Sequence, residues 1–353
     1  MEKSMTAKKW LDRGVYLSSM ALSALINRGK DPKSLNFNNI LCIKEDEIGD
    51  FIYTLPVYAM LRKQFPAARI TVLCRPFGLD LLQHCPDVDQ AISQYPDARQ
   101  QFDLIIDLRG TVASTLLALR RWPLYRLDRG TVRYRNRQSG QHPQEAETNW
   151  QILKVLVDER HKLLEPRLYI SDSERQQAAD FLRERNIGRY ALFHTGARRI
   201  LKKWPLERVA VIMKHLHSEF GLDCILAGDQ QDAADSVQLQ KMLDFPLKVA
   251  AGKVKLLTFA ALCEKADFFL GNDSGPLHIA ATMGTPALGL YGPGDPIFHP
   301  RQANAGFLHH ILECNPCDQV HCKYPENPCI LRISTGEVQT EARRLMKAKG
   351  EIR

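Results

Sequence analysis

The stretch ILCIKEDEIGDFIYTLPVYAMLRKQFPAARITVLC, residues 40–74, decides the fold, because it begins and ends with a short run of apolar residues. A helix-like segment that reaches Gln64 separates the two runs, residues 40–44 and 70–74. Short apolar runs joined by amphipathic segments are typical of parallel strands whose crossover helices cover both faces of the sheet. The stretch therefore predicts a strand, a helix and a second, parallel strand of an α/β sheet.

The same rhythm continues to LIIDL at residues 104–108 and restarts at YALFH, residues 190–194. A chain of 353 residues exceeds the size that one hydrophobic core usually serves. We therefore expect two Rossmann-like, doubly wound parallel-sheet domains facing a central cleft, with the linker near residues 158–172. The expected parts are a basic amphipathic extension over 1–36, a first domain over 37–165 and a second domain over 166–353. Ligands of such sheets bind at the carboxyl ends of the strands.

The composition is that of a soluble globular protein, with 44% apolar and 25% charged residues. The apolar stretch from Val15 to Ile26 contains three serines and is too short to span a bilayer. No small-residue cleavage site follows Ile26, which disfavours a secretory signal. An odd number of cysteines, nine, favours a reducing compartment. We expect a cytoplasmic protein without a transmembrane helix.

Two common nucleotide-binding motifs are missing. The first strand is followed by EDEIGD, and neither G-x-G-x-x-G nor the Walker P-loop pattern occurs in the chain. This disfavours a dinucleotide-dependent dehydrogenase. In GNDSG, residues 271–275, the serine stands one place late for the G-x-S-x-G pattern, which disfavours a serine hydrolase.

Two loops in the second half are suited to anions. Asp273, Ser274 and Gly275 stand between an apolar run and a helix that we expect Pro276 to start, and helix N-termini attract anions. His278 follows two residues later. Helix capping by Asp273 or Ser274 is the alternative.

The second such loop follows YALFH, where Thr195, Gly196 and Ala197 come before Lys202 and Lys203. An ammonium group suits a departing phosphate, although a loop lysine is often only solvated.

A basic segment and a cysteine-rich loop complete the candidates. Seven arginines between residues 120 and 137 predict an anionic partner, with a solvated loop as the alternative and no nucleic-acid motif beside them. They are Arg120, Arg121, Arg126, Arg129, Arg133, Arg135 and Arg137. Within residues 314–329 stand Cys314, Cys317, Cys322 and Cys329, spaced C-x2-C-x4-C-x6-C, which predicts a structural zinc or iron site. Disulfides or unligated loop cysteines are the alternatives.

Taken together, ILCIKEDEIGDFIYTLPVYAMLRKQFPAARITVLCRP, HTGA with KKWP, and NDSGPLHIAATMGTPALGLYGPGDP resemble glycosyltransferase family 9. These are the ADP-heptose lipopolysaccharide heptosyltransferases. The resemblance implies the GT-B fold and inverting transfer of heptose from ADP-L-glycero-D-manno-heptose to a sugar hydroxyl of the lipopolysaccharide inner core. It implies no cofactor for catalysis, and it implies that Asp50 is the general base. For Asp50 the alternative is to cap a helix beginning at Phe51.

By the same resemblance, the second half binds the donor. Lys202 and the amides around Ser274 and Gly275 would hold the diphosphate, with Asp273 near the sugar and His278 completing the site. Other donor contacts would come from Thr195, Gly196, Ala197 and Val254, the last through its backbone at the nucleotide base. Relatives often carry a ribose-contacting glutamate where this chain has DQQD, residues 229–232, so that contact is open.

The acceptor would be an anionic core oligosaccharide that Arg120 and Arg121 attract in the first half. The basic N-terminal stretch, with Lys3, Lys8, Lys9 and Arg13, predicts either a helix on the inner face of an anionic membrane or a helix packed on the domain. Two alternative functions are left open. One is a transferase of the same fold with another nucleotide sugar or a protein acceptor, and the other is a non-catalytic sugar-phosphate-binding protein.

Overall fold

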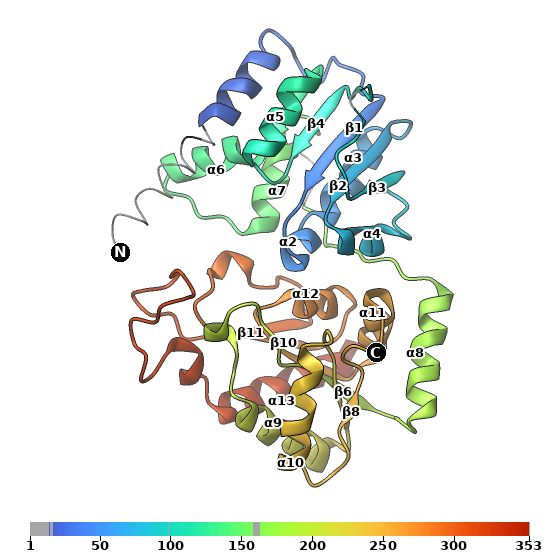
Figure 1. Ribbon diagram of the computed structural model, residues 1–353, viewed down its shortest axis with the longest axis vertical. Coiled ribbons are helices and arrows are strands. Elements are labelled where there is room, and N and C mark those ends of the chain that lie inside the picture. The colour runs from blue at the N-terminus through green and yellow to red at the C-terminus, as the bar shows by residue number, and fades with distance from the viewer. Residues whose placement is uncertain (1–13, 15–16, 98, 158–162, 353) are drawn as a thin grey trace. The chain divides into compact units, whose positions relative to one another are not determined.

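The computed structural model describes residues 14, 17–97, 99–157 and 163–352. The chain forms two compact units, Met1–Tyr169 and Ile170–Arg353 (Figure 1). The division lies inside the segment 158–172 that was predicted as the linker. Each unit contains one parallel sheet with helices packed on it, which confirms the predicted fold class of two parallel-sheet α/β domains.

The first unit has a five-stranded parallel sheet in the order β3-β2-β1-β4-β5. Its strands are β1 Asn39–Lys44, β2 Arg69–Cys74, β3 Gln90–Ile92, β4 Leu104–Asp107 and β5 Tyr125–Asp128. In the register, Ile40 of β1 lies between Ile70 of β2 and Leu104 of β4. The chain winds from β1 outward in one direction and from β4 in the other. The crevice where ligands bind such sheets therefore opens beyond the carboxyl ends of β1 and β4.

Helices cover this sheet on its two faces (Figure 1). They are α2 Ile48–Ile52, α3 Leu55–Gln64, α4 Pro76–Leu82, α5 Val112–Arg121, α6 Arg129–Gln138 and α7 Glu145–Leu153. Residues 17–26 form a further helix, whose Leu22 and Ile26 share one core cluster with Leu117 of α5. The described part of the N-terminal segment is thus packed on the domain, as one of the two alternatives expected. Lys3, Lys8, Lys9 and Arg13 lie outside the described residues.

The second unit has a six-stranded parallel sheet in the order β11-β10-β9-β6-β7-β8. Its strands are β6 Tyr190–His194, β7 Asp223–Leu226, β8 Lys248–Val249, β9 Phe268–Asn272, β10 Ala287–Tyr291 and β11 Ala305–His309. The winding direction reverses between the neighbouring strands β6 and β9. The loops that follow these two strands therefore border the ligand crevice of this sheet.

Among the described residues, six helices belong to the second unit. They are α8 Asp172–Glu184, α9 Leu206–Phe220, α10 Asp235–Met242, α11 Leu256–Lys265, α12 Gly275–Thr282 and α13 Thr335–Ile352. Three of them, α9, α10 and α13, share one large core cluster with strands of the sheet. Short 3-10 turns are η1 Ile200–Lys202, η2 Asp232–Ala234, η3 Pro296–Phe298 and η4 Cys329–Arg332. Among the helices that the structure describes, none has the length and apolar character needed to cross a membrane.

Candidate active-site residues

Asp50 lies in the first turn of α2, directly after the loop that leaves the central strand β1. Helix α2 begins at Ile48, so Asp50 is inside the helix and does not cap a helix beginning at Phe51. Its side chain retains 26% of its exposure and is the accessible carboxylate of a charge network whose other carboxylates are buried. This placement at the carboxyl end of a strand at the switch point suits a residue that meets a substrate.

The network around Asp50 is built by Arg129, the first residue of α6. Its guanidinium contacts Glu145 (Nη2 to Oε1 2.5 Å), Asp46 (Nη1 to Oδ2 3.1 Å) and Asp50 (Nη2 to Oδ1 3.9 Å). Lys44, the fully buried last residue of β1, pairs with Asp46 (Nζ to Oδ2 2.7 Å). Arg129 is 4% exposed and Glu145 has no exposed side-chain surface. Charged groups can be buried in this way because each one forms an ion pair with a group of opposite charge.

The network acts on the protonation of Asp50 in both directions. Burial raises the pKa of Asp50, Lys44 and Arg129 oppose the rise, and Asp46 and Glu145 add to it, so that the net pKa is above that of an ordinary aspartate. A general base works best when its pKa approaches the working pH while the group remains ionised. The net shift of Asp50 is in that direction.

The arginine-rich segment is not the solvated loop that was one of the expectations. It forms α5, β5 and α6, and Arg121, Arg126 and Arg129 are buried. Arg121 donates to the carbonyl oxygens of Pro96 (2.6 Å) and Gln100 (2.8 Å), so its guanidinium holds a loop. Because these hydrogen bonds occupy its guanidinium, Arg121 is poorly suited to bind the acceptor. Arg120 is exposed and has no such constraint on its accessibility.

Arg126 is also structural. It donates to Ser23 Oγ (2.6 Å) and to the carbonyl oxygen of Ser19 (2.9 Å), and it contacts Asp107 (Nη2 to Oδ2 3.0 Å). These bonds join the N-terminal helix, residues 17–26, to the edge of the sheet. Sequence position alone could not distinguish such buried arginines from the exposed ones, because burial depends on the partners that the fold supplies.

In the second unit, the two predicted anion-binding loops lie side by side because they follow adjacent strands. Asn272, the last residue of β9, donates from Nδ2 to the carbonyl oxygen of Thr195 (2.8 Å). The same amide accepts from the backbone N–H of Trp204 (3.1 Å), which is buried. One buried amide thus ties the loop after β6 to the loop after β9.

Lys202 and Asp273 form an ion pair at this junction, with Nζ 2.6 Å from Oδ2 and side-chain exposures of 17% and 10%. Helix α12 begins at Gly275, with Ser274 as its N-cap residue and Pro276 in its first turn. The side chain of Ser274 makes no capping hydrogen bond, so the capping alternative for this residue is not observed. The positive end of the α12 dipole and the ammonium of Lys202 therefore stand close to one carboxylate, Asp273.

The structure reveals a relay that sequence reasoning missed. Ser274 Oγ lies 3.1 Å from His194 Nδ1, and His194 Nε2 lies 3.2 Å from Asp232 Oδ2. Burial would raise the pKa of Asp232, but His194 and the N–H of Asp229 reverse this and lower it. The Ser274 hydroxyl thus lies between His194 Nδ1 and the carbonyl oxygen of Asn272 (3.1 Å), while His194 Nε2 faces the carboxylate of Asp232. His194 ends an apolar strand, and Asp232 belongs to the DQQD segment where the ribose contact was left open.

His278 is buried beneath these residues in the first turns of α12. Burial lowers the pKa of His278 to about 4, with Lys202 adding to the shift and Asp273 opposing it. His278 is therefore neutral near pH 7, so it acts there as a hydrogen-bonding group and not as a cation.

The remaining predicted donor residues lie in loops of the same sheet. Gly196 packs so closely on Asp232 that an added Cβ would stand 2.0 Å from Oδ1, which explains a glycine at this position. Thr195 donates from Oγ1 to Asp235 Oδ2 (2.6 Å), so its hydroxyl is already engaged. Ala197 and Val254 are half-buried, Ala197 after β6 and Val254 before α11.

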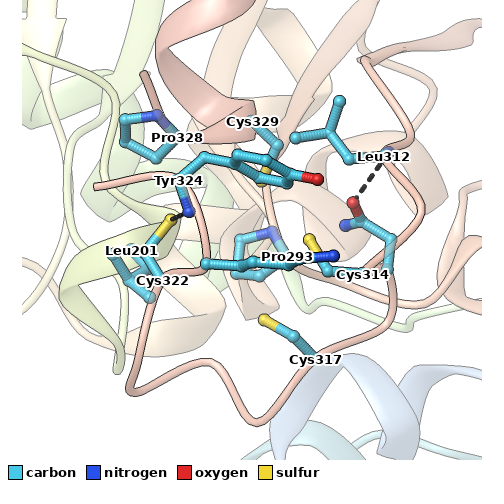
Figure 2. A pocket seen from close by; sticks show the side chains of 11 residues that line it. Leu201, Pro293, Leu312, Cys314, Cys317, Cys322, Tyr324, Pro328 and Cys329 are labelled. Carbon is cyan, nitrogen blue, oxygen red and sulfur yellow. Dashed lines mark hydrogen bonds between the residues drawn. The ribbon is translucent and has the colours of Figure 1, made fainter. Parts of the chain in front are cut away.

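The four clustered cysteines line one small cavity of about 10 Å³ (Figure 2). The backbone N–H groups of Gln319 and Tyr324 donate to the sulfurs of Cys317 and Cys322, each at 3.4 Å. All nine cysteines are free thiols. In the part of the chain that the structure describes, no three His, Cys, Asp or Glu side chains are arranged as ligands of a metal ion. The four thiols therefore lie around one cavity, but their sulfur atoms are not arranged around a single metal position.

Comparison with solved structures shows which fold the chain shares. ADP-heptose lipopolysaccharide heptosyltransferase II of Escherichia coli superposes with a TM-score of 0.71 over 88% of this chain and 99% of that one, at 23% identity. The iron-containing dodecameric glycosyltransferase TibC of enterotoxigenic Escherichia coli H10407 superposes with a TM-score of 0.58 over 90% of this chain and 78% of that one, at 15% identity. The protein is a glycosyltransferase with the GT-B fold.

Sequence comparison narrows the class to a family. Lipopolysaccharide heptosyltransferase 3 of Escherichia coli is 28% identical over 282 residues, which cover 71% of this chain and 82% of that relative. The family model for glycosyltransferase family 9 (heptosyltransferase) matches residues 98–327, more than half of the chain. The chain belongs to glycosyltransferase family 9, the heptosyltransferase family, as its sequence motifs predicted.

Proposed function

We propose that this enzyme transfers heptose from ADP-L-glycero-D-manno-heptose, with inversion, to a sugar hydroxyl of the lipopolysaccharide inner core. Binding of the donor is supported by one observation: the ion pair between Lys202 and Asp273 lies at the N-terminus of α12. A helix N-terminus beside an ammonium is a place where a diphosphate is held without a glycine-rich loop. The heptosyltransferase relatives agree with heptose as the sugar.

In the proposed reaction, the acceptor hydroxyl oxygen attacks the anomeric carbon of the donor as the bond to the diphosphate breaks. Asp50 takes the proton of that hydroxyl, and ADP leaves with the electron pair of the broken bond. Negative charge grows on the departing phosphate, where Lys202 and the amides of Ser274 and Gly275 would stabilise it. Each partner acts on the atom where charge develops, and none of these steps uses a cofactor.

In this proposal, donor binding changes the partner of the Lys202 ammonium, which pairs with Asp273 in the structure. A diphosphate at the α12 N-terminus would share the ammonium with Asp273, which would then be available for a hydroxyl of the sugar. His278, neutral at working pH, would hydrogen-bond there without competing as a cation. Thr195, Gly196 and Ala197 would line the phosphate loop, with Val254 near the base.

Lys202→Met is expected to lower kcat by about 10² to 10³, because removing one fixed donor to a developing negative charge costs about 2.7–4 kcal/mol. The measurement is ADP release at saturating donor and acceptor. Lys203→Met is the matched control, since it makes the same change one residue later. The assignment of Lys202 fails if the Lys203 variant loses more activity, or if Lys202→Met turns over at nearly the normal rate.

Two alternatives are separated from this proposal by one experiment. A panel of ADP-, UDP- and GDP-sugars, followed by nucleotide release with core oligosaccharide or protein as acceptor, tests the same-fold transferase with another substrate. Release that depends on ADP-heptose and on the oligosaccharide supports the proposal. Binding of nucleotide without release from any donor would instead identify a non-catalytic sugar-phosphate-binding protein.

A structural zinc or iron ion in the cysteine-rich loop is a further part of the proposal. It is supported by four thiols around one cavity and by N–H groups aimed at two of the sulfurs, because thiolate ligands commonly accept such bonds. Burial raises the pKa of Cys329, and the nearby Cys317 and Cys314 add to the rise, so the loop resists carrying several thiolates without a cation. The iron-containing TibC structure makes iron a candidate beside zinc.

Protein purified without chelator or added metal is expected to contain close to one equivalent of zinc or iron by plasma emission spectrometry. Cys317→Ser together with Cys322→Ser is expected to remove that metal and to lower the thermal midpoint, because a structural metal contributes folding free energy. Cys85→Ser, which lies outside the loop, is the control. A wild-type protein free of both metals would contradict the site.

A further inference from the structure

Three side chains from separate segments of the second unit form one hydrogen-bonded chain. His194 ends β6, Asp232 begins η2, and Ser274 directly precedes α12. His194 Nε2 lies 3.2 Å from Asp232 Oδ2, and His194 Nδ1 lies 3.1 Å from Ser274 Oγ. Only 7% of the His194 side chain and 12% of the Asp232 side chain are exposed. We call these three residues the Asp232–His194–Ser274 chain.

The carboxylate of Asp232 is enclosed at one end of this chain. Its Oδ2 also accepts a hydrogen bond from the backbone N–H of Asp229 (3.0 Å). An added Cβ on Gly196 would stand 2.0 Å from Oδ1 of Asp232, and one on Gly228 would stand 2.3 Å from Oδ2. Gly228 moreover has a φ of +146°, which a residue with a side chain rarely adopts. The two glycines and the N–H of Asp229 therefore hold the carboxylate in a position that faces His194.

The hydroxyl of Ser274 is held at the other end of the chain. Its Oγ lies 3.1 Å from His194 Nδ1 and 3.1 Å from the carbonyl oxygen of Asn272. A serine at the N-cap position ordinarily accepts a hydrogen bond from an N–H group of the first helical turn, but Ser274 makes no such bond with α12. His194 and Asn272 thus keep the hydroxyl beside the positive end of the helix without using it as a cap.

We propose that Asp232 is a positioning residue for the donor diphosphate, because it fixes, through His194, the Ser274 hydroxyl at the start of α12. This inference rests on the proposed function and deepens it, since it names the residues that keep the diphosphate site in shape. Groups that are already held in place bind a ligand with a smaller loss of conformational freedom, and supporting hydrogen bonds supply that order. Asp232 is assigned here to His194 and not to the ribose.

The test is the affinity of the full-length protein for ADP, measured by calorimetry, in Asp232→Ala and Ser274→Ala, alone and combined. Each single variant is expected to bind ADP roughly tenfold more weakly, the usual effect of losing one hydrogen bond that involves a charged group. If Asp232 acts through Ser274, the double variant should bind about as weakly as either single variant, because their effects are not additive. Asp244→Ala changes an exposed aspartate of the same unit and should bind ADP like the wild type.

Steady-state kinetics add a readout that a general loss of structure would not produce. In Asp232→Ala, the KM for ADP-heptose should rise while the KM for the acceptor stays unchanged. His194→Phe keeps an aromatic ring but removes both nitrogens, so it should reproduce the weaker ADP binding, and thermal melting shows whether it remains folded.

Two results would overturn this inference alone. One is ADP binding by Asp232→Ala that equals that of Asp244→Ala, and the other is a double variant in which the losses of the two single variants add. Wild-type protein without affinity for ADP would overturn the proposed function together with this inference, so the two failures are distinguishable.

Discussion

Asp50→Asn is expected to lower kcat by about 10² to 10⁴, the usual contribution of a positioned general base, while leaving ADP-heptose binding nearly unchanged. The amide keeps the size of the side chain but cannot take the proton of the acceptor hydroxyl. Asp50 lies in the first unit, whereas the residues proposed to hold the donor lie in the second. Single-turnover rates and donor affinity by calorimetry measure the two effects separately.

Asp80→Asn, an exposed carboxylate on α4, is the matched control and should leave both quantities unchanged. The pH profile adds a readout that folding defects do not produce. Because the pKa of Asp50 is raised by burial, the acidic limb of kcat/KM should lie above the pH at which an ordinary aspartate titrates, with activity lost as pH falls through that limb. Near-normal turnover by the Asn variant would end the role of Asp50 as the base.

Arg129→Met is expected to lower the free energy of unfolding by about 3–5 kcal/mol, the usual cost of removing one partner from a buried ion pair. Burial alone would raise the pKa of Glu145, and the attraction of Arg129 and Arg133 more than reverses this, so the pKa is lowered. Without Arg129, the fully buried carboxylate of Glu145 loses one of these two ion pairs and keeps the one with Arg133. Urea denaturation followed by far-UV circular dichroism measures the loss.

Two further variants make this result specific. Arg135→Met removes an exposed arginine from the same helix and should change stability by no more than about 0.5 kcal/mol. Arg129→Met combined with Glu145→Gln removes both buried charges and should recover part of the lost stability. A loss below about 1 kcal/mol in the single variant would show that the network does not need Arg129.

Much of the fold could be read from the sequence because the relevant signals are local. Buried parallel strands must be short and apolar, and the crossover helices between them must be amphipathic, so the runs at residues 40–44 and 190–194 were visible in isolation. The loops worth attention followed from the same reasoning, since ligands meet parallel sheets at the carboxyl ends of their strands. Asp50, Lys202 and Ser274 were selected in this way, together with the family resemblance.

The failures have one cause, which is that partners distant in sequence decide the state of a polar side chain. Arg120 and Arg121 are neighbours in the chain, yet one is exposed and the other binds the carbonyl oxygens of residues 96–100. Arg129 belonged to a basic segment by composition, but Glu145 and Asp46 make it the centre of a buried network. His194 and Asp232 gave no signal until the fold placed them beside Ser274.

The sequence by itself thus determined the two parallel-sheet domains and the family, and it selected the loops proposed for the chemistry, because apolar periodicity and short motifs are encoded along the chain. Only the tertiary structure decided which charges are paired, which are exposed, and which way the protonation of Asp50 and His278 is shifted. Those properties depend on burial and on the distances between groups that are far apart in sequence, and both are set when the sheets and helices pack.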